Sequence, residues 1–163
     1  MTDTVQNLRA VELDFLDHAP HRFDYAEPLS APPAAVFAAI SADPSTWSWF
    51  PGVDEGSYEG GGAPGVGTRR WVHVGGVKYR ETMLAWDEPR RWTYRVDETS
   101  APVFAALLED WVMEPADGGT TTLRWTFAFD PLPETAELMT GARELIGGTF
   151  HDAARGLDAQ LRS

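Results

Sequence analysis

The chain has 163 residues, of which 43% are apolar, so it is long enough to form one domain with a sizeable hydrophobic core. Its 25 Asp and Glu residues outnumber its 13 Lys and Arg residues, and the net charge of −12 makes nucleic acids and anionic membrane surfaces unfavourable partners. It has no cysteine, no basic leader before an apolar run and no apolar segment of membrane-spanning length, which excludes disulfides and thiolate metal sites and predicts a cytoplasmic protein without membrane insertion.

Residues 1–21 are predicted to be an N-terminal extension, and their pattern leaves the secondary structure open. Apolar residues in this segment fit a helical spacing, but residues 11–15 also alternate apolar and acidic side chains as a strand does. His18 and His21 fall in an expected loop. Because no third ligand is near, we expect them to be solvated rather than metal-binding. Residues 22–163 are assigned to a single domain.

A strand and a short helix are predicted next. Residues 22–30 alternate, with Phe23 and Tyr25 on one face, as in a strand. A helix over residues 33–41 follows, because Ser30 can cap it, prolines can occupy its first turn and it has a short apolar face. Residues 43 and 44, an Asp-Pro pair, end this helix and start a second short one, which carries three aromatic residues: Trp47, Trp49 and Phe50.

Residues 53–59 form a weak predicted strand, and a glycine-rich stretch, GGGAPGVG, occupies residues 60–67. A phosphate-binding loop needs a helix directly behind its glycines, but here the sequence RRWVHV follows, which is typical of a strand. We therefore interpret the glycines as a flexible connection between strands.

The middle of the chain predicts five consecutive antiparallel strands joined by short turns. Gly-Gly at 75–76 and Asp-Gly-Gly at 117–119 are hairpin signals. The predicted strands cover residues 68–74, 77–86, 91–97, 107–114 and 120–130. The stretch SAPVFAALLED between the third and fourth of these is apolar up to its first acidic residue, so it is interpreted as a linker beside an opening.

A long amphipathic helix is predicted over residues 133–161. At helical spacing, one stripe contains Leu138, Ala142, Ile146, Phe150, Ala153, Leu157 and Leu161. Because the preceding elements are almost all strands, this stripe is expected to pack on the concave face of a curved sheet. Gly147 and Gly148 interrupt it, and either a close approach or a kink would account for them. His151 is expected at the surface.

This order of elements resembles the helix-grip fold of the START-like or SRPBCC superfamily. Four stretches carry the resemblance: APPAAVFAAISADPSTWSWF, PGVGTRRWVHVGG, LAWDEPRRWTYRV and MEPADGGTTTLRW. They are most similar to the bacterial polyketide cyclase/dehydrase-like members, over residues 22–162. The resemblance implies an α+β fold in which a curved antiparallel sheet of about six to seven strands wraps a long C-terminal helix. It also implies a ligand cavity between the sheet and that helix.

By resemblance to the ligand-binding members, one strand turns Arg70, Val72 and Val74 inward, and its neighbour turns Tyr79, Glu81 and Met83 inward. An Arg in an apolar cavity needs a partner, so Glu81, or a ligand carboxylate or carbonyl, is expected to pair with Arg70. Two solvated charges on the outer face are the alternative. If Arg70 orients a ligand, Arg70→Ala should abolish binding and leave the melting temperature nearly intact.

Apolar residues on the other strands and on the helix complete the predicted site. Alternation directs them toward the helix, although any single aromatic residue can be ordinary core. The further predicted ligand-binding residues are Trp92, Tyr94, Trp125, Phe127, Ile146 and Phe150. His73 alternates with Val72 and is expected outside. No metal or cofactor site and no catalytic motif is evident.

Three functions remain open from the sequence. The first is the binding of a hydrophobic small molecule such as a lipid, isoprenoid or aromatic polyketide. The second, implied by the resemblance, is a polyketide cyclase or dehydrase in which Arg70, Tyr79 and Glu81 polarise carbonyls and move protons. The third is an interaction domain whose interior is filled by its own side chains. A homodimer is compatible with each of these.

Overall fold

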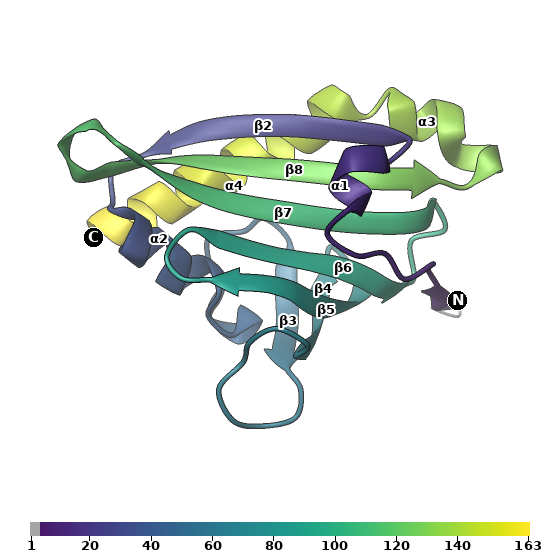
Figure 1. Cartoon of the computed structure of the whole chain (residues 1–163), viewed down its shortest axis with the longest axis horizontal. Coiled ribbons are helices and arrows are strands. Elements are labelled where there is room, and N and C mark those ends of the chain that lie inside the picture. Colours follow the sequence, from purple (N-terminus) through teal and green to yellow (C-terminus); the bar gives the residue numbers. More distant parts are fainter. Residues whose placement is uncertain (1–3) are drawn as a thin grey trace.

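The computed structural model describes residues 4–163, and in this range one eight-stranded antiparallel sheet forms most of the molecule (Figure 1). Its strands are β1 (Gln6–Asn7), β2 (His21–Leu29), β3 (Val53–Tyr58), β4 (Arg69–Val74), β5 (Val77–Asp87), β6 (Arg91–Thr99), β7 (Phe104–Ala116) and β8 (Thr120–Pro131). The helices are α1 (Phe15–His18), α2 (Pro33–Ile40), α3 (Ala136–Thr140) and α4 (Arg143–Arg162). Short 3-10 turns are η1 (Pro44–Thr46), η2 (Asp117–Gly119) and η3 (Pro133–Thr135).

The strand order β2-β8-β7-β6-β5-β4-β3 confirms the predicted meander from β4 to β8. β2 closes one side by pairing with β8, and the short β1 pairs with β6. The linker is shorter than predicted, because β7 begins at Phe104 and only residues 100–103 connect it to β6. The extra residues pair with the end of β8, with a register shift between Phe104 and Ala106, which keeps their backbone hydrogen bonds within the sheet.

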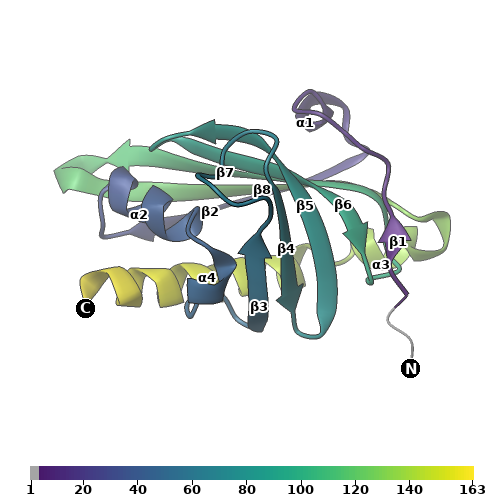
Figure 2. The same cartoon turned by 90° about the horizontal axis from the view of Figure 1, so that it is seen from below.

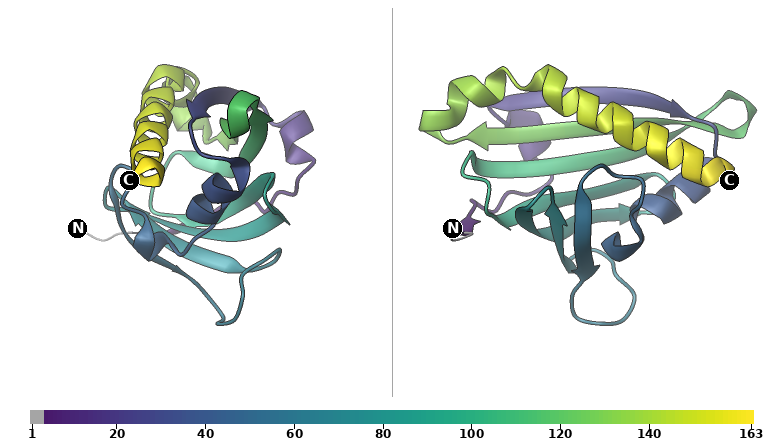
Figure 3. Two further views of the ribbon diagram at one scale, coloured as in Figure 1. Left: turned by 90° about the vertical axis from the view of Figure 1, so that its left-hand side faces the viewer. Right: turned by 180° about the vertical axis from the view of Figure 1, so that it is seen from behind.

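The C-terminal helix lies across the concave face of the sheet, as the amphipathic pattern predicted (Figures 2 and 3). α4 buries Phe150, Ala153 and Leu157 against the sheet and α2, whereas its other side carries exposed charged residues. Burial of this stripe is the main favourable term that holds helix and sheet together. The fold is therefore the α+β helix grip expected from the sequence.

The first turn of the predicted helix is a separate element, which is a correction to the sequence prediction. α3 ends at Thr140 and α4 begins at Arg143, with Gly141 between them. The break changes which side chains face inward: Leu138 is 68% exposed and Met139 is 7% exposed. A stripe drawn through one continuous helix placed Leu138 inside because it assumed an unbroken 3.6-residue period.

The adjacent glycines of α4 have different environments. A Cβ on Gly147 would lie 2.7 Å from Cε1 of Tyr25, whereas one on Gly148 would meet no atom within 4 Å. The hydroxyl of Tyr25 donates to the carbonyl of Arg143 at 2.7 Å, which holds this ring against the helix. α4 continues as one helix through both positions, so close approach, rather than a kink, accounts for Gly147.

The first short helix is confirmed, but the second is only a 3-10 turn. Asp43 accepts a hydrogen bond from the backbone N–H of Ser45 and starts η1, which ends before the aromatic residues. Trp47 and Trp49 are buried in the irregular segment beyond it. Helix is disfavoured there because Pro51 follows Phe50 directly.

The predicted cap of α2 is also wrong. The N-cap residue is Pro32, which makes no side-chain cap. Ser30 instead donates its backbone N–H and its hydroxyl to Oδ1 of Asp158 on α4, at 2.8 and 2.7 Å. Because the acceptor is a carboxylate, these hydrogen bonds are charge-assisted, and Ser30 ties the chain before α2 to α4 instead of capping α2.

The N-terminal extension crosses the outer, convex face of the sheet. Val11 and Phe15 pack there against a small apolar cluster of Ala106, Leu108 and Ala128. The two histidines are not in a loop: His18 ends α1, and His21 begins β2, where its ring stacks on Phe129 at 5.4 Å. The alternation of residues 11–15 does not form a strand: within residues 4–20 the strand is β1, and the helix α1 covers only Phe15–His18.

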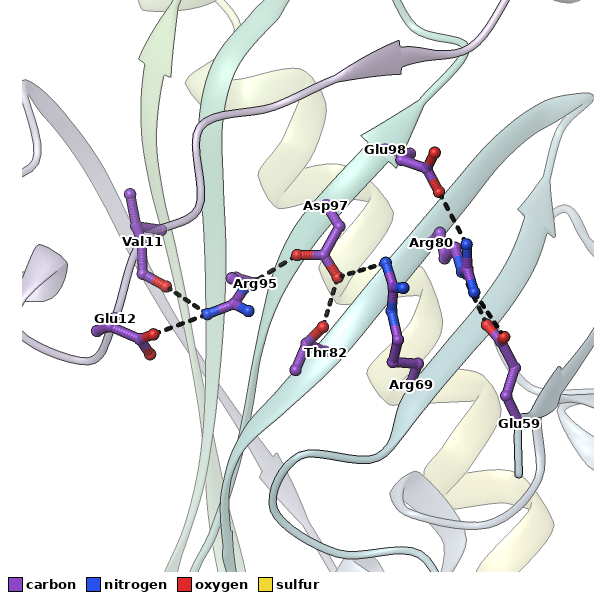
Figure 4. A network of polar contacts seen from close by, with 9 residues as sticks. All are labelled: Val11, Glu12, Glu59, Arg69, Arg80, Thr82, Arg95, Asp97 and Glu98. Atoms are coloured by element: carbon purple, nitrogen blue, oxygen red, sulfur yellow. Dashed lines mark hydrogen bonds and ion pairs between the residues drawn. The ribbon is translucent and has the colours of Figure 1, made fainter. Parts of the chain in front are cut away.

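Charged residues form a network on the same outer face and show which way the strands are turned (Figure 4). Arg95 donates to Asp97 and to Glu12 of the extension, both at 2.9 Å, and Arg80 donates to Glu59 and Glu98. Because successive side chains of a strand alternate between faces, Tyr94 beside Arg95 and Glu81 beside Arg80 point to the concave side. The described helices include none long and apolar enough to cross a membrane.

Candidate functional site

A cavity of about 290 Å³ lies between the concave face of the sheet and the segment containing α3 and α4. Eight of the predicted site residues line it: Arg70, Val72, Tyr79, Glu81, Tyr94, Trp125, Phe127 and Ile146. Val74, also expected to point inward, lines it too. Met83, Trp92 and Phe150 do not line it, and at 0%, 0% and 1% exposure they are core residues behind its wall.

Arg70 and Glu81 form a buried ion pair in the wall of this cavity. They are direct partners on β4 and β5, and their side chains are 1% and 3% exposed. Nε of Arg70 donates to Oε1 of Glu81 at 2.7 Å, and its Nη2 contacts the same oxygen. The prediction that Arg70 faces Glu81 inside the fold is therefore confirmed, and the alternative of two solvated charges is wrong.

Three aromatic rings surround the guanidinium of Arg70. Its Cζ lies 4.9, 4.8 and 5.0 Å from the ring centroids of Trp47, Trp92 and Tyr94. Each ring presents electron density that favours a cation. Nη1 of Arg70, however, has no hydrogen-bond acceptor among residues 4–163. A buried donor without an acceptor costs free energy, and Nε1 of Trp47, another lining residue, also has no partner among the described residues.

The ionisation of the pair follows from its burial. Burial alone lowers the pKa of the Arg70 guanidinium, but Glu81 and two nearby tyrosines more than offset this, so the pKa rises. Burial raises the pKa of Glu81, and the charge of Arg70 opposes that rise. Each charge is stable in the interior because the other is beside it.

Glu109 is a second buried acid in the cavity, and the sequence analysis did not identify it. It lies on β7, is 9% exposed and accepts a hydrogen bond from Nε1 of Trp125 at 3.0 Å. Burial, together with the charge of Glu81, raises its pKa to about 8. Its inward direction could have been read from the alternation of Leu107, Glu109 and Trp111. Glu109 was missed because it fell in the stretch interpreted as a linker, at the start of the predicted strand.

Two tyrosines add neutral hydroxyl groups to the cavity. Burial raises the pKa of Tyr79, and Glu109 raises it further. The pKa of Tyr94 is also well above its ordinary value, again chiefly because the ring is buried. Both phenols are therefore protonated across the physiological range. Tyr94 already shares a hydrogen bond with Glu109, whereas Tyr79 can donate one to a bound molecule.

Segments outside the predicted set supply the rest of the lining. Ala101 and Val103 belong to the β6–β7 connection, so the linker does lie beside the cavity as expected. Other lining residues that sequence reasoning missed come from irregular segments, from helices and from the first positions of two strands: Trp47, Phe50, Met139, Thr149, Val53 and Phe104. An irregular segment has no period from which its inward side could be predicted.

The histidines lie away from the cavity. His73 is on the outer side of β4, where its Nδ1 is 3.0 Å from Glu55, and His151 is exposed beside Glu27. Both positions agree with the sequence analysis. Within residues 4–163 no group of three or more His, Asp or Glu side chains could hold a metal ion. The chemistry available at the site is therefore that of a largely apolar cavity with one ion pair, one acid and two phenols.

Comparisons with known proteins agree with this architecture. The structure is similar to a START superfamily protein from Mycobacterium smegmatis, with a TM-score of 0.70 and 13% identity over 87% of this chain and 97% of that one. It is similar to the Zhui aromatase/cyclase from Streptomyces sp. R1128, with a TM-score of 0.68 and 18% identity over 86% and 92% of the two chains. Ara h 8.0201 gives a TM-score of 0.61 and 20% identity over 84% and 97%.

At these identities the solved structures establish the fold. No curated protein sequence matches the chain. The profile of one family, described as polyketide cyclase / dehydrase and lipid transport, matches residues 20–162, which is nearly the whole chain and includes every residue of the cavity. The chain therefore belongs to the polyketide cyclase / dehydrase and lipid transport family.

Proposed function

We propose that the protein binds a hydrophobic small molecule, such as a lipid, isoprenoid or aromatic polyketide, in the cavity between the sheet and α4. The observation that carries the proposal is an apolar, aromatic cavity wall in which two buried donors, Nη1 of Arg70 and Nε1 of Trp47, have no acceptor among the described residues. Small-molecule sites typically combine an apolar lining with a few polar groups that set orientation. The volume of about 290 Å³ is at the lower end of such sites.

The predicted site residues would have two roles in binding. Val72, Trp125, Phe127 and Ile146 supply apolar contact area, and Arg70 orients the polar end of the ligand. The cavity itself argues against the third function considered above, an interaction domain whose own side chains fill its interior.

A cyclase or dehydrase is the second candidate, because of the family and because three polar residues share one cavity. Arg70, Tyr79 and Glu81 all line it, so a ketone-rich chain held there would meet a cation, a phenol and a carboxylate together. Such a site can promote ring closure by holding the substrate in a productive conformation and polarising its carbonyl groups. Turnover of a poly-keto substrate that is lost in Tyr79→Phe would favour this candidate.

Native mass spectrometry of the purified protein tests the binding proposal first, through the mass of any co-purified apolar molecule. Ile146→Trp then fills the cavity from α4, whereas Leu145→Trp places the same side chain at the adjacent position, which is 76% exposed. We expect Ile146→Trp to lose the ligand and Leu145→Trp to keep it. A protein that never carries an apolar ligand, or an Ile146→Trp variant that binds as well as the Leu145→Trp control, would refute the proposal.

A further inference from the structure

The cavity is lined by one basic residue, Arg70, and by two acidic residues, Glu81 and Glu109. Arg70 is already matched by Glu81, to which it donates. Glu109 is the third group and lies on β7, two strands from the β5 strand of Glu81, with β6 between them. An ionised Glu109 would leave the cavity with one uncompensated negative charge, which is costly to bury.

The surroundings of Glu109 offer no second cation. The only cationic residue lining the cavity, within the described part of the chain, is Arg70. α3 and α4 present only uncharged side chains to it: Met139, Ile146 and Thr149. The charged and titratable groups that act on Glu109 from the strands are Glu81, Tyr94 and Arg70, and Tyr79 also lies within electrostatic range.

These surroundings favour the protonated form of Glu109. Burial and the negative charge of Glu81 disfavour a second carboxylate, and they raise the pKa of Glu109 to about 8. Its carboxyl group already makes two hydrogen bonds, since Oε1 accepts the N–H of Trp125 and the group also hydrogen-bonds with Tyr94. A protonated carboxyl group held in this way has an O–H to donate, and the cavity lies in front of it.

We propose that Glu109 is a specificity-determining residue, which donates a hydrogen bond from its acid form to an uncharged oxygen acceptor on the ligand. The inference rests on the proposed binding function and narrows the ligand class to molecules with an apolar or aromatic body and a neutral carbonyl. A carbonyl is favoured over a carboxylate, because an anionic ligand would add a second buried negative charge beside Glu81. A plain hydrocarbon would leave the donors of Glu109 and Arg70 unpaired.

Three naphthalene derivatives of matched shape test the inference: 2-acetylnaphthalene, 2-ethylnaphthalene and 2-naphthoate. Binding is followed by the tryptophan fluorescence of the protein, since Trp47 and Trp125 line the cavity. At about pH 6.5 the ketone should bind roughly two- to tenfold more tightly than the hydrocarbon, as expected for one hydrogen bond, and more tightly than the carboxylate. At about pH 9.5, above the pKa of Glu109, the preference for the ketone should disappear.

Variants at Glu109 separate hydrogen bonding from packing. Glu109→Gln keeps an N–H donor and cannot ionise, so it should retain the preference for the ketone at both pH values. Glu109→Leu should bind the hydrocarbon at least as well as the natural protein and lose the preference. Glu114→Leu is the matched control, because Glu114 is on the same strand but is exposed and paired with Arg124. It should leave the preference unchanged.

Each outcome decides the inference. Equal affinity for ketone and hydrocarbon in the natural protein at about pH 6.5 overturns it, and so does a pH-dependent preference that persists in Glu109→Gln. If Glu109→Leu does not fold, the Gln variant and the pH profile of the natural protein still decide. Binding of all three probes with equal affinity overturns the role of Glu109 alone. Binding of none by the folded protein, checked by circular dichroism, overturns the proposed function together with this inference.

Discussion

The burial of the Arg70–Glu81 pair leads to a strong prediction about stability. Arg70→Ala removes the partner of a carboxylate whose side chain is only 3% exposed, and leaves that charge in an apolar cavity. Loss of one partner from a buried ion pair costs about 3–5 kcal/mol. It also removes a guanidinium held 4.8–5.0 Å from three ring centroids, which places the expected cost in the upper part of this range.

For a chain of this length, 1 kcal/mol corresponds to about 2–4 °C in melting temperature. We therefore expect Arg70→Ala to melt roughly 8–20 °C below the natural protein when unfolding is followed by circular dichroism. This reverses the expectation from the sequence alone, which left the melting temperature nearly intact because the burial of both partners was unknown. Loss of ligand binding in this variant would consequently not separate a binding role from a structural one.

Two further variants serve as controls for the melting temperature of Arg70→Ala. Arg124→Ala breaks a pair with Glu114 of similar geometry, at 2.7 Å, but the side chains are 52% and 45% exposed. This change should cost less than about 1 kcal/mol. The double variant Arg70→Met, Glu81→Leu removes both charges and should regain most of the stability lost in Arg70→Ala. The reasoning is refuted if Arg70→Ala melts no lower than Arg124→Ala, or if the double variant melts as low as the single one.

Two other predictions concern α4. Gly148→Ala places its Cβ in open space and should raise the free energy of unfolding by up to about 1 kcal/mol. Gly156→Ala should lower the free energy of unfolding, because its Cβ would lie 2.6 Å from the backbone oxygen of Trp49. Urea denaturation of both variants measures these changes, and equal effects would contradict the prediction. The hydrogen bonds from Ser30 lower the pKa of Asp158 below 3.8, so its contribution to stability is present above that value and is lost as the pH falls further. The melting-temperature gap between the natural protein and Asp158→Ala should therefore shrink below about pH 3.8, and a gap independent of pH would argue against this role.

Local pattern predicted much of the fold. Alternation along 68–86 placed Arg70, Tyr79 and Glu81 on one face, and the Gly-Gly and Asp-Gly-Gly turns located the hairpins correctly. These predictions succeeded because side-chain direction in a strand and the need for positive φ in a tight turn are local properties. The resemblance to a known superfamily supplied the concave face and the position of the helix.

Other features depend on contacts between distant segments. Glu109 becomes a buried acid only because β5, β6 and β8 surround it, and Trp47 reaches Arg70 from an irregular segment that has no period to follow. Leu138 and Met139 exchange sides because the chain turns between α3 and α4. Ser30 makes its hydrogen bonds with Asp158, on a helix 128 positions away, rather than with its own neighbour α2.

The sequence by itself determined the strands, the turns and the amphipathic helix, whereas the inward direction of the Arg70–Glu81 pair was expected only from the resemblance to a known superfamily. Only the tertiary structure decided which charges are desolvated, which aromatic residues form core rather than cavity wall, and that a second acid faces the cavity. The physical reason is that secondary structure follows from short-range sterics and periodicity. Burial, and with it pKa and ligand preference, follows from the sum of contacts made by segments far apart in the chain.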